Sequence, residues 1–179
     1  MKYAGMPHAM WILFGKSFRT HLTTVFHLDA STAKEVAAKA KKKYKEILAD
    51  VPSFEKGDRF QSNLVNAALL AAFILNMPEK PDMDTLTVYY AESMMTKPIK
   101  WFCKKSGSSK FTDKDIAGMQ ATARFKAAER NPDSWNMEFY PYSDGSGYEA
   151  RFTKCGICEL MKKLGLYDLT PALCHLDYT

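Results

Sequence analysis

Residues that act as nucleophiles or metal ligands in proteins gather in the last twenty-five positions of the chain. Three of the four cysteines lie there, at Cys155, Cys158 and Cys174, and His175 and Asp177 stand close behind the last of them. Thiolates and imidazoles bind zinc, and thiolates also attack electrophilic carbon atoms. We therefore expect the chemistry of the protein at this end of the chain.

Cys155 is predicted to stand where a strand meets a helix. Apolar and polar residues alternate over 148–153, as in a strand with one buried face, and residues 157–164 have a helical pattern that Gly165 ends. The N-terminus of a helix stabilises a thiolate and lowers the pKa of a cysteine placed there. Cys155 or Cys158 therefore occupies a position suited to a nucleophile or a ligand.

A last helix is expected to begin at Thr170-Pro171, with the threonine as cap and the proline in the first helical position. On this helix Cys174 and Asp177 are three residues apart and share a face, whereas His175 points about 100° away. Folding of the two short helices against each other would join this face to the cysteines at the strand end. The expected site then adds Cys155 and, optionally, Cys158.

Several interpretations of this cluster stay open. A zinc site would use all three cysteines with His175 or Asp177 as fourth ligand, but the second half lacks the paired spacing typical of zinc motifs. A redox Cys-x-x-Cys pair of the thioredoxin type belongs to a βαβ unit, which the sequence does not predict. A nucleophilic cysteine assisted by a carboxylate is chemically allowed. Buried structural thiols are the alternative to all three.

The rest of the chain predicts helices that must hold this centre in place. Residues 58–77 are apolar almost all round and form the expected central helix, whereas 33–49 are lysine-rich and suit a peripheral helix with Thr32 in a capping box. Cys103, isolated in sequence, is expected to be a buried structural thiol. Further helices are predicted over 7–26, 83–95, 99–103 and 112–130, with Asp82 as the cap of the second and Thr112 as the cap of the last.

The pattern changes from helical to alternating after Asn131-Pro132. Two alternating segments, separated by the glycine-rich 143–147, predict an antiparallel β-hairpin. The expected fold class is α+β: a mainly helical single domain over 1–179, with a small antiparallel hairpin near the C-terminus followed by two short helices. Residues 1–130 form the predicted helical part, and 134–179 the hairpin with the cysteine-bearing helix pair.

Composition limits the classes of function. With 46% hydrophobic residues and a net charge of +5 the chain is an ordinary globular protein, and its lysine cluster lacks the arginines and aromatics of a nucleic-acid reader. The longest apolar run, 67–75, is about half the length of a membrane span, and residues 1–8 show no export signal. We expect a cytoplasmic protein with reduced thiols and a small-molecule substrate, with neither nucleic acid nor membrane as partner; a homo-oligomer stays open.

The C-terminal residues resemble a known family. Phe152-Thr-Lys-Cys155 at a strand end, a short helix to Leu164-Gly-Leu166, and Leu169-x-Pro171-x-x-Cys174-x-x-Asp177-Tyr178 are similar to the L-2-amino-thiazoline-4-carboxylic acid hydrolases. The resemblance covers about residues 135–178. It implies a bacterial-type hydrolase that opens a cyclic isothiourea to N-carbamoyl-cysteine.

The resemblance implies roles for three residues: Cys155 or Cys174 as nucleophile or sulfur contact, and Asp177 as the group that binds the amidinium or orients water. Arg151 is a candidate to bind the substrate carboxylate, because it lies shortly before the site helix and near Tyr148. The alternative is an exposed ion pair of Arg151 with a neighbouring glutamate. The predicted function is hydrolysis of a carbon–nitrogen bond in a small cyclic amidine, with no cofactor predicted. The alternative is a non-catalytic module that binds a small ligand or a divalent metal through Cys155, Cys158, Cys174 and His175.

Overall fold

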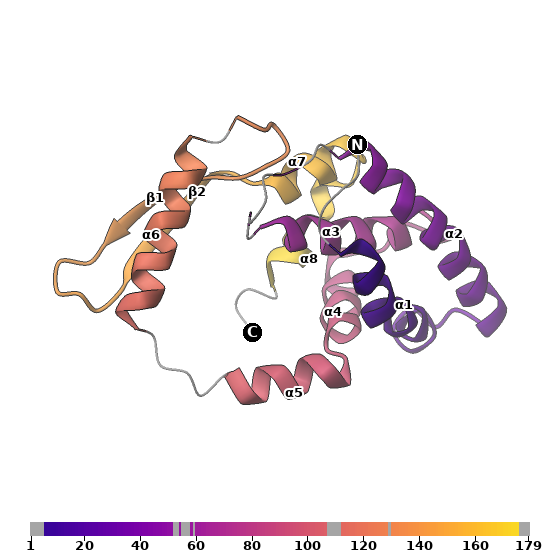
Figure 1. Cartoon of the computed structure of the whole chain (residues 1–179). Coiled ribbons are helices and arrows are strands. Elements are labelled where there is room, and N and C mark those ends of the chain that lie inside the picture. Colours follow the sequence, from indigo (N-terminus) through magenta and orange to yellow (C-terminus); the bar gives the residue numbers. More distant parts are fainter. Residues whose placement is uncertain are drawn as a thin grey trace.

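The computed structural model describes residues 6–51, 54, 58, 60–106, 112–128 and 130–175. Within them helices dominate, and one two-stranded antiparallel sheet lies near the C-terminus with short helices after it. The predicted α+β class with a mainly helical chain is therefore confirmed. Figure 1 shows the helices of the first half gathered on one side, with the hairpin on the other.

A helical body is formed by α1 (Pro7–Thr24), α2 (Ala30–Asp50), α3 (Gln61–Ile74) and α4 (Met83–Met94). Every residue of α3 from Ala67 to Ile74 is buried, as expected for the central helix, because alanines let neighbouring backbones approach closely. Helix α1 packs against α2, α3 and α4. Phe18 is fully buried in this core and lies against the rings of Phe73 and Tyr89.

Helix α2 begins three residues earlier than the sequence pattern predicts. Its cap is Asp29, whose carboxylate accepts hydrogen bonds from the amides of Ser31 and Thr32, so the expected capping box at Thr32 is wrong. An aspartate in this position satisfies helix amides that have no partner within the helix. The lysines face outward, yet α2 still buries one stripe against the body that includes Tyr44 and Ile47.

Helix α4 begins after its predicted cap, Asp82, which accepts from the amide of Thr85. The next helix, α5 (Lys97–Ser106), extends beyond the predicted range. Its Trp101 is 64% exposed, and Cys103 is exposed as well, so the prediction of a buried thiol at Cys103 is wrong. The reason is tertiary: α5 lies beside the body without being covered by it (Figure 1).

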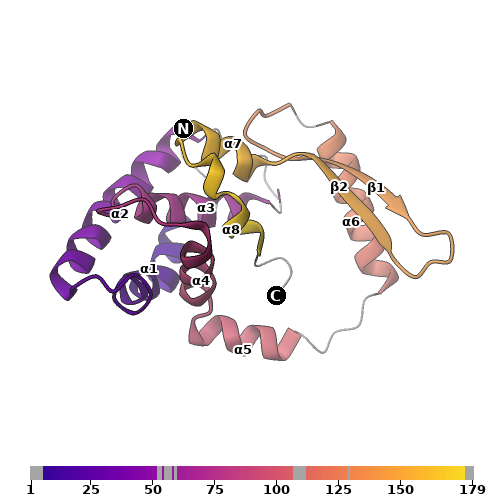
Figure 2. The same cartoon turned by 180° about the vertical axis from the view of Figure 1, so that it is seen from behind.

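The C-terminal half contains a second layer. Helix α6 (Asp113–Ala127) starts at the expected cap, Thr112, which forms a capping box with Asp115, and it packs on strand β1 (Asn136–Pro141). Strand β2 (Tyr148–Lys154) pairs antiparallel with β1, as predicted. Figure 2 shows α6 and the hairpin together on the side of the molecule away from α1 and α2.

The chain returns to the helical body after β2. Helix α7 (Gly156–Lys163) packs on α3, and after a 3-10 turn over Tyr167–Leu169 the short α8 (Pro171–Cys174) packs on α4. Thr170 does not cap α8 as expected, because the preceding turn already gives it helical torsions of φ −58° and ψ −36°. In both views α7 and α8 lie between the body and the layer of α6 and the hairpin (Figures 1 and 2).

A buried ion pair connects these layers. The ammonium of Lys126 in α6 donates to the carboxylate of Asp58, which precedes α3, and also to Ser134 at 2.7 Å. The side chains of Lys126 and Asp58 are 1% and 0% exposed. The rings of Phe54 and Phe60 lie 6.0 and 5.6 Å from the ammonium, and their faces attract a cation.

Candidate active site

Cys155 stands between a strand and a helix, as the sequence predicts. It follows β2 and is the cap residue of α7, with extended torsions of φ −124° and ψ 119°. Its side chain makes no capping hydrogen bond to the helix, so the sulfur is not engaged by the amides of the first turn. The thiol is half-buried at the end of β2.

The start of α7 is set by a close approach at Gly156. A Cβ at this position would clash with the backbone oxygen of Asp133 and would lie 2.7 Å from the ring of Trp135. Only glycine lets the helix begin this close to the segment that leads into β1. The backbone around Trp135 therefore fixes the position of Cys155.

The turn after α7 brings Cys174 back toward the start of that helix. Gly165 has φ +70°, and the amides of Gly165 and Leu166 donate to the carbonyls of Lys162 and Met161, at 3.1 and 2.8 Å. This pattern is a Schellman motif, which ends a helix sharply. Buried apolar residues then hold α7 and α8 on the body; they are Leu160, Met161, Leu166, Leu169, Ala172 and Leu173.

Cys155 and Cys158 are in hydrogen-bond contact after β2, and Cys174 lies near enough for its charge to act on Cys158. Burial, followed by the charge of Cys155, a hydrogen bond to Cys155 and the charge of Cys174, raises the pKa of the Cys158 thiol to about 11, against the opposing charge of Lys162. Because that bond favours the protonated form of Cys158, Cys158 is its donor and the sulfur of Cys155 its acceptor. At pH 7 roughly one Cys158 in ten thousand is then a thiolate. Cys158 holds a proton in this cluster, which leaves Cys155 and Cys174 as the candidates for attack.

Lys162 is a cation close to this cluster, because its charge acts on Cys158 and opposes the rise in the pKa of that thiol. It forms an ion pair with Glu159 at 3.0 Å and lies 5.0 Å from the centre of the Tyr167 ring. Sequence reasoning did not single it out. The sequence nevertheless contains a signal for it: Lys162 lies four residues after Cys158, and residues four apart share a helix face.

The other residues predicted for the site are placed less closely together. Cys174 and His175 are exposed at the end of α8, and Asp177 lies outside the described residues. Across the described ranges no three His, Cys, Asp or Glu side chains are grouped to hold a metal ion. The catalytic roles of Cys155, Cys174 and Asp177 stay predictions, as does the metal alternative.

The two candidate substrate ligands lie on the hairpin. Arg151 is exposed in β2 and pairs in register with Glu138, next to the exposed Tyr140. Tyr148 is half-buried at the far end of β2, where its ring lies 5.0 Å from that of Phe139. At about 3.3 Å per strand residue, Arg151 is roughly 13 Å along the chain from Cys155. Their role toward a substrate stays a prediction.

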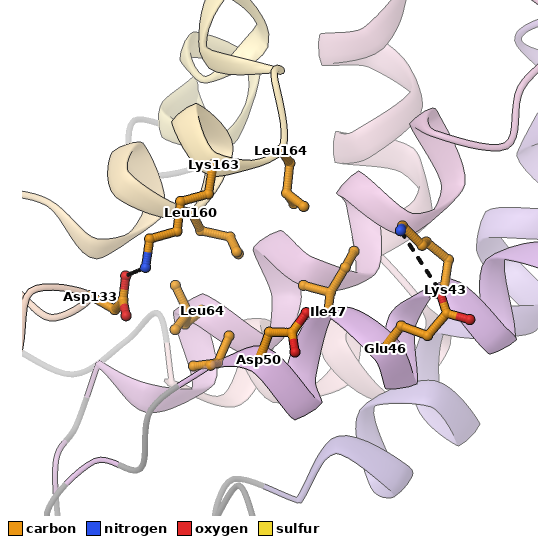
Figure 3. Close-up of a pocket in the computed structure, with 10 residues that line it drawn as sticks. Lys43, Glu46, Ile47, Asp50, Leu64, Asp133, Leu160, Lys163 and Leu164 are labelled. Carbon is orange, nitrogen blue, oxygen red and sulfur yellow. Dashed lines mark hydrogen bonds and ion pairs between the residues drawn. The ribbon is translucent and has the colours of Figure 1, made fainter.

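A cavity that the sequence did not suggest lies on the other side of α7. It has a volume of about 210 Å³ and is lined by residues of α2, α3 and α7 together with Asp133. Figure 3 shows Lys163 reaching from α7 to Asp133 along one side of it. No cysteine lines this cavity. A cavity assembled from three helices leaves no local signal in the sequence, because its lining comes from segments that lie far apart along the chain.

A helical protein with a small hairpin and a thiol cluster at the strand-to-helix junction is the class that the fold and the site define. The model of the L-2-amino-thiazoline-4-carboxylic acid hydrolase family matches residues 61–179, about two thirds of the chain. The chain therefore belongs to that family, which confirms the resemblance. No curated protein and no solved structure matches the chain. No helix within the described ranges combines the length and apolar character needed to cross a membrane.

Proposed function

We propose that this protein is a hydrolase that opens the ring of a small, amino-acid-like cyclic amidine. The family supports the reaction class, and its model covers all of α7 and α8 with their cysteines. The observation that carries the proposal is the hydrogen-bonded pair of Cys155 and Cys158 close to Cys174, in which the raised pKa of Cys158 marks it as the thiol that keeps its proton. Such a division of roles suits nucleophilic catalysis by a cysteine.

The proposed reaction starts at the amidine carbon. The thiolate of Cys155 or Cys174 adds to this carbon, while Asp177 accepts an N–H of the amidinium or orients the water that follows. One ring bond to that carbon then breaks, and the departing ring atom takes a proton. Water attacks the same carbon and displaces the cysteine sulfur, so the net change is the addition of one water molecule to the ring.

The ring bond that breaks defines the product. In N-carbamoyl-cysteine both nitrogens stay on the former amidine carbon, so the carbon–sulfur bond of the ring is broken and a thiol is released. Hydrolysis of the ring carbon–nitrogen bond, as the sequence prediction has it, would instead leave the carbamoyl group on sulfur and release an amine. Titration of thiol released from 2-amino-thiazoline-4-carboxylate separates these outcomes.

The test uses single serine variants of the purified full chain. We expect Cys155→Ser or Cys174→Ser to lower kcat by at least about a hundredfold, because a hydroxyl without an activating base is a far weaker nucleophile. Cys103→Ser is the matched control, since Cys103 is exposed on α5 and should be replaceable without loss. Full ring-opening activity in both Cys155→Ser and Cys174→Ser would overturn covalent catalysis.

A further inference from the structure

The two faces of α7 differ in what they carry. Leu160, Lys163 and Leu164 follow the helical spacing of three and four and line the 210 Å³ cavity, whereas Cys158 and Lys162 stand about 180° away on the same helix. The cavity is therefore separate from the cysteine cluster proposed for catalysis. Helices α2 and α3 close its other sides (Figure 3).

The chemical character of the cavity comes from Asp133. This side chain lies among the lining residues and is only 4% exposed. Lys163 donates to its Oδ1, whereas Oδ2 is buried and has no hydrogen-bond partner in the described part of the chain. A buried carboxylate oxygen without a donor is costly, because it has lost its hydrogen bonds to water and gained none in return. Oδ2 has almost no accessible surface in this arrangement, so a ligand that offers it an N–H must first turn the carboxylate toward the cavity, and the new hydrogen bond would then remove that penalty.

The remaining lining sets the size and charge of the ligand. Two lysines and three carboxylates surround the cavity, and Lys43 is already paired with Glu46 at 3.6 Å, so a positive ligand is favoured. Its volume is below the range of about 300–1,000 Å³ found for drug-sized ligands, which limits the ligand to a few heavy atoms. The apolar part of the wall suits a short hydrocarbon body; it consists of Ile47, Val51, Leu64, Leu160 and Leu164.

We propose that the cavity between α2, α3 and α7 binds a small organic cation, with an ammonium or amidinium N–H donated to Oδ2 of Asp133. The hydrocarbon body of the ligand rests on Leu64 and Leu160 in the apolar wall. Lys163 stays on Oδ1 and holds the carboxylate in position for the cation. The site does not depend on the proposed hydrolase activity.

The first test compares three probes of similar shape and different charge. The full chain, with labelled leucine and isoleucine methyl groups, is titrated in separate experiments with butylammonium, butan-1-ol and butyrate. We expect saturable shifts at Leu64, Leu160 and Leu164 for butylammonium, with a Kd in the millimolar range. The alcohol and the carboxylate should bind at least about tenfold more weakly. Equal binding of butan-1-ol, or no saturable binding of butylammonium, would overturn the proposal.

Variants identify the residue responsible. Asp133→Asn should raise the Kd of butylammonium about tenfold or more, whereas Asp168→Asn, which removes the carboxylate of the exposed pair with Lys80, should leave it unchanged. Leu164→Phe fills the cavity from a partly exposed position and should abolish binding even if Asp133→Asn fails to fold. An unchanged Kd in Leu164→Phe would place the probe elsewhere and refute the site.

Failure of this site and failure of the proposed reaction give different results. Cys155→Ser and Cys174→Ser should keep the wild-type Kd for butylammonium, because neither cysteine lines the cavity. A Kd raised tenfold in either variant would show that the probe binds at the cysteine cluster instead, and would refute the separate site.

Discussion

The helical body and the C-terminal region bury different kinds of side chain. The core of α1 to α4 is built from aliphatic and aromatic residues, and Ser93 is a polar exception within it. Around α6 and the start of β1 the chain buries Lys126, Asp133 and Ser134, and Asp58 reaches them from the segment before α3. Apolar burial is non-directional and tolerates small shifts, whereas buried charges require specific partners.

This difference indicates where single substitutions act most strongly. The body is stabilised by many contacts of similar kind, so its stability is shared among them. The C-terminal region is held in place by a few polar contacts and by the close backbone approach at Gly156, and the thiol cluster lies in the same region.

Removing the buried ammonium should have the largest effect. Lys126→Met should lower the free energy of unfolding by roughly 3–5 kcal/mol, because it leaves the carboxylate of Asp58 buried without its partner. Urea denaturation of the full chain measures the change.

Two further variants sharpen that result. Lys80→Met removes a lysine of similar length from the exposed pair with Asp168 and should cost about 1 kcal/mol or less. The double variant Asp58→Leu with Lys126→Met should be more stable than Lys126→Met alone, because no charge is then left buried. A loss in Lys126→Met no larger than in Lys80→Met would contradict the structural role of the buried pair.

A methyl group at the start of α7 should have an intermediate effect. Gly156→Ala should cost about 1–3 kcal/mol, because the new Cβ collides with the Asp133 backbone and the Trp135 ring. Gly118→Ala is the matched control, since nothing lies within 4 Å of its Cβ position in α6, and it should be neutral or stabilising by up to about 1 kcal/mol. Thermal unfolding of both proteins compares them, and equal losses would show that the close approach at Gly156 is not needed.

The rates at which Cys103 and Cys158 react with a thiol reagent should differ and should depend on pH, without a large change in stability. Iodoacetamide at pH 7, followed by peptide mass analysis, should modify the exposed Cys103 quickly and Cys158 at least about tenfold more slowly. The rate at Cys158 should rise as the pH approaches about 11, the raised pKa of that thiol. Equal rates at Cys103 and Cys158 at pH 7 would contradict the assignment of Cys158 as the thiol that holds its proton.

The same shift has a consequence for folding. The pKa of Cys158 is higher in the folded chain than the value of about 8.5 for an unfolded thiol. The folded state therefore binds this proton more tightly, and its contribution to stability is complete below about pH 8.5 and is lost as the pH rises toward 11. In Cys158→Ser this part of the pH dependence should disappear.

Local patterns explain most of the correct predictions. Asp82 and Thr112 each begin a helix as expected, because a cap needs only amides within the next three residues. The alternation of apolar and polar residues predicted both strands of the hairpin, because it too is a local pattern. Two predictions that depended on packing are wrong. Cys103 is exposed because α5 is left uncovered, and Thr170 does not cap α8 because the preceding turn gives it helical torsions.

The α+β class, the place of Cys155 between β2 and α7, and the family resemblance could all be predicted from the sequence, since each rests on residues close together in the chain. Which charged groups become buried together depends on the packing of the whole fold. Lys126 meets Asp58 across 68 positions, and Lys163 meets Asp133 across 30. Each pair forms only where segments far apart in the chain pack together. The exclusion of water that strengthens the attraction between such charges exists only once that packing has formed.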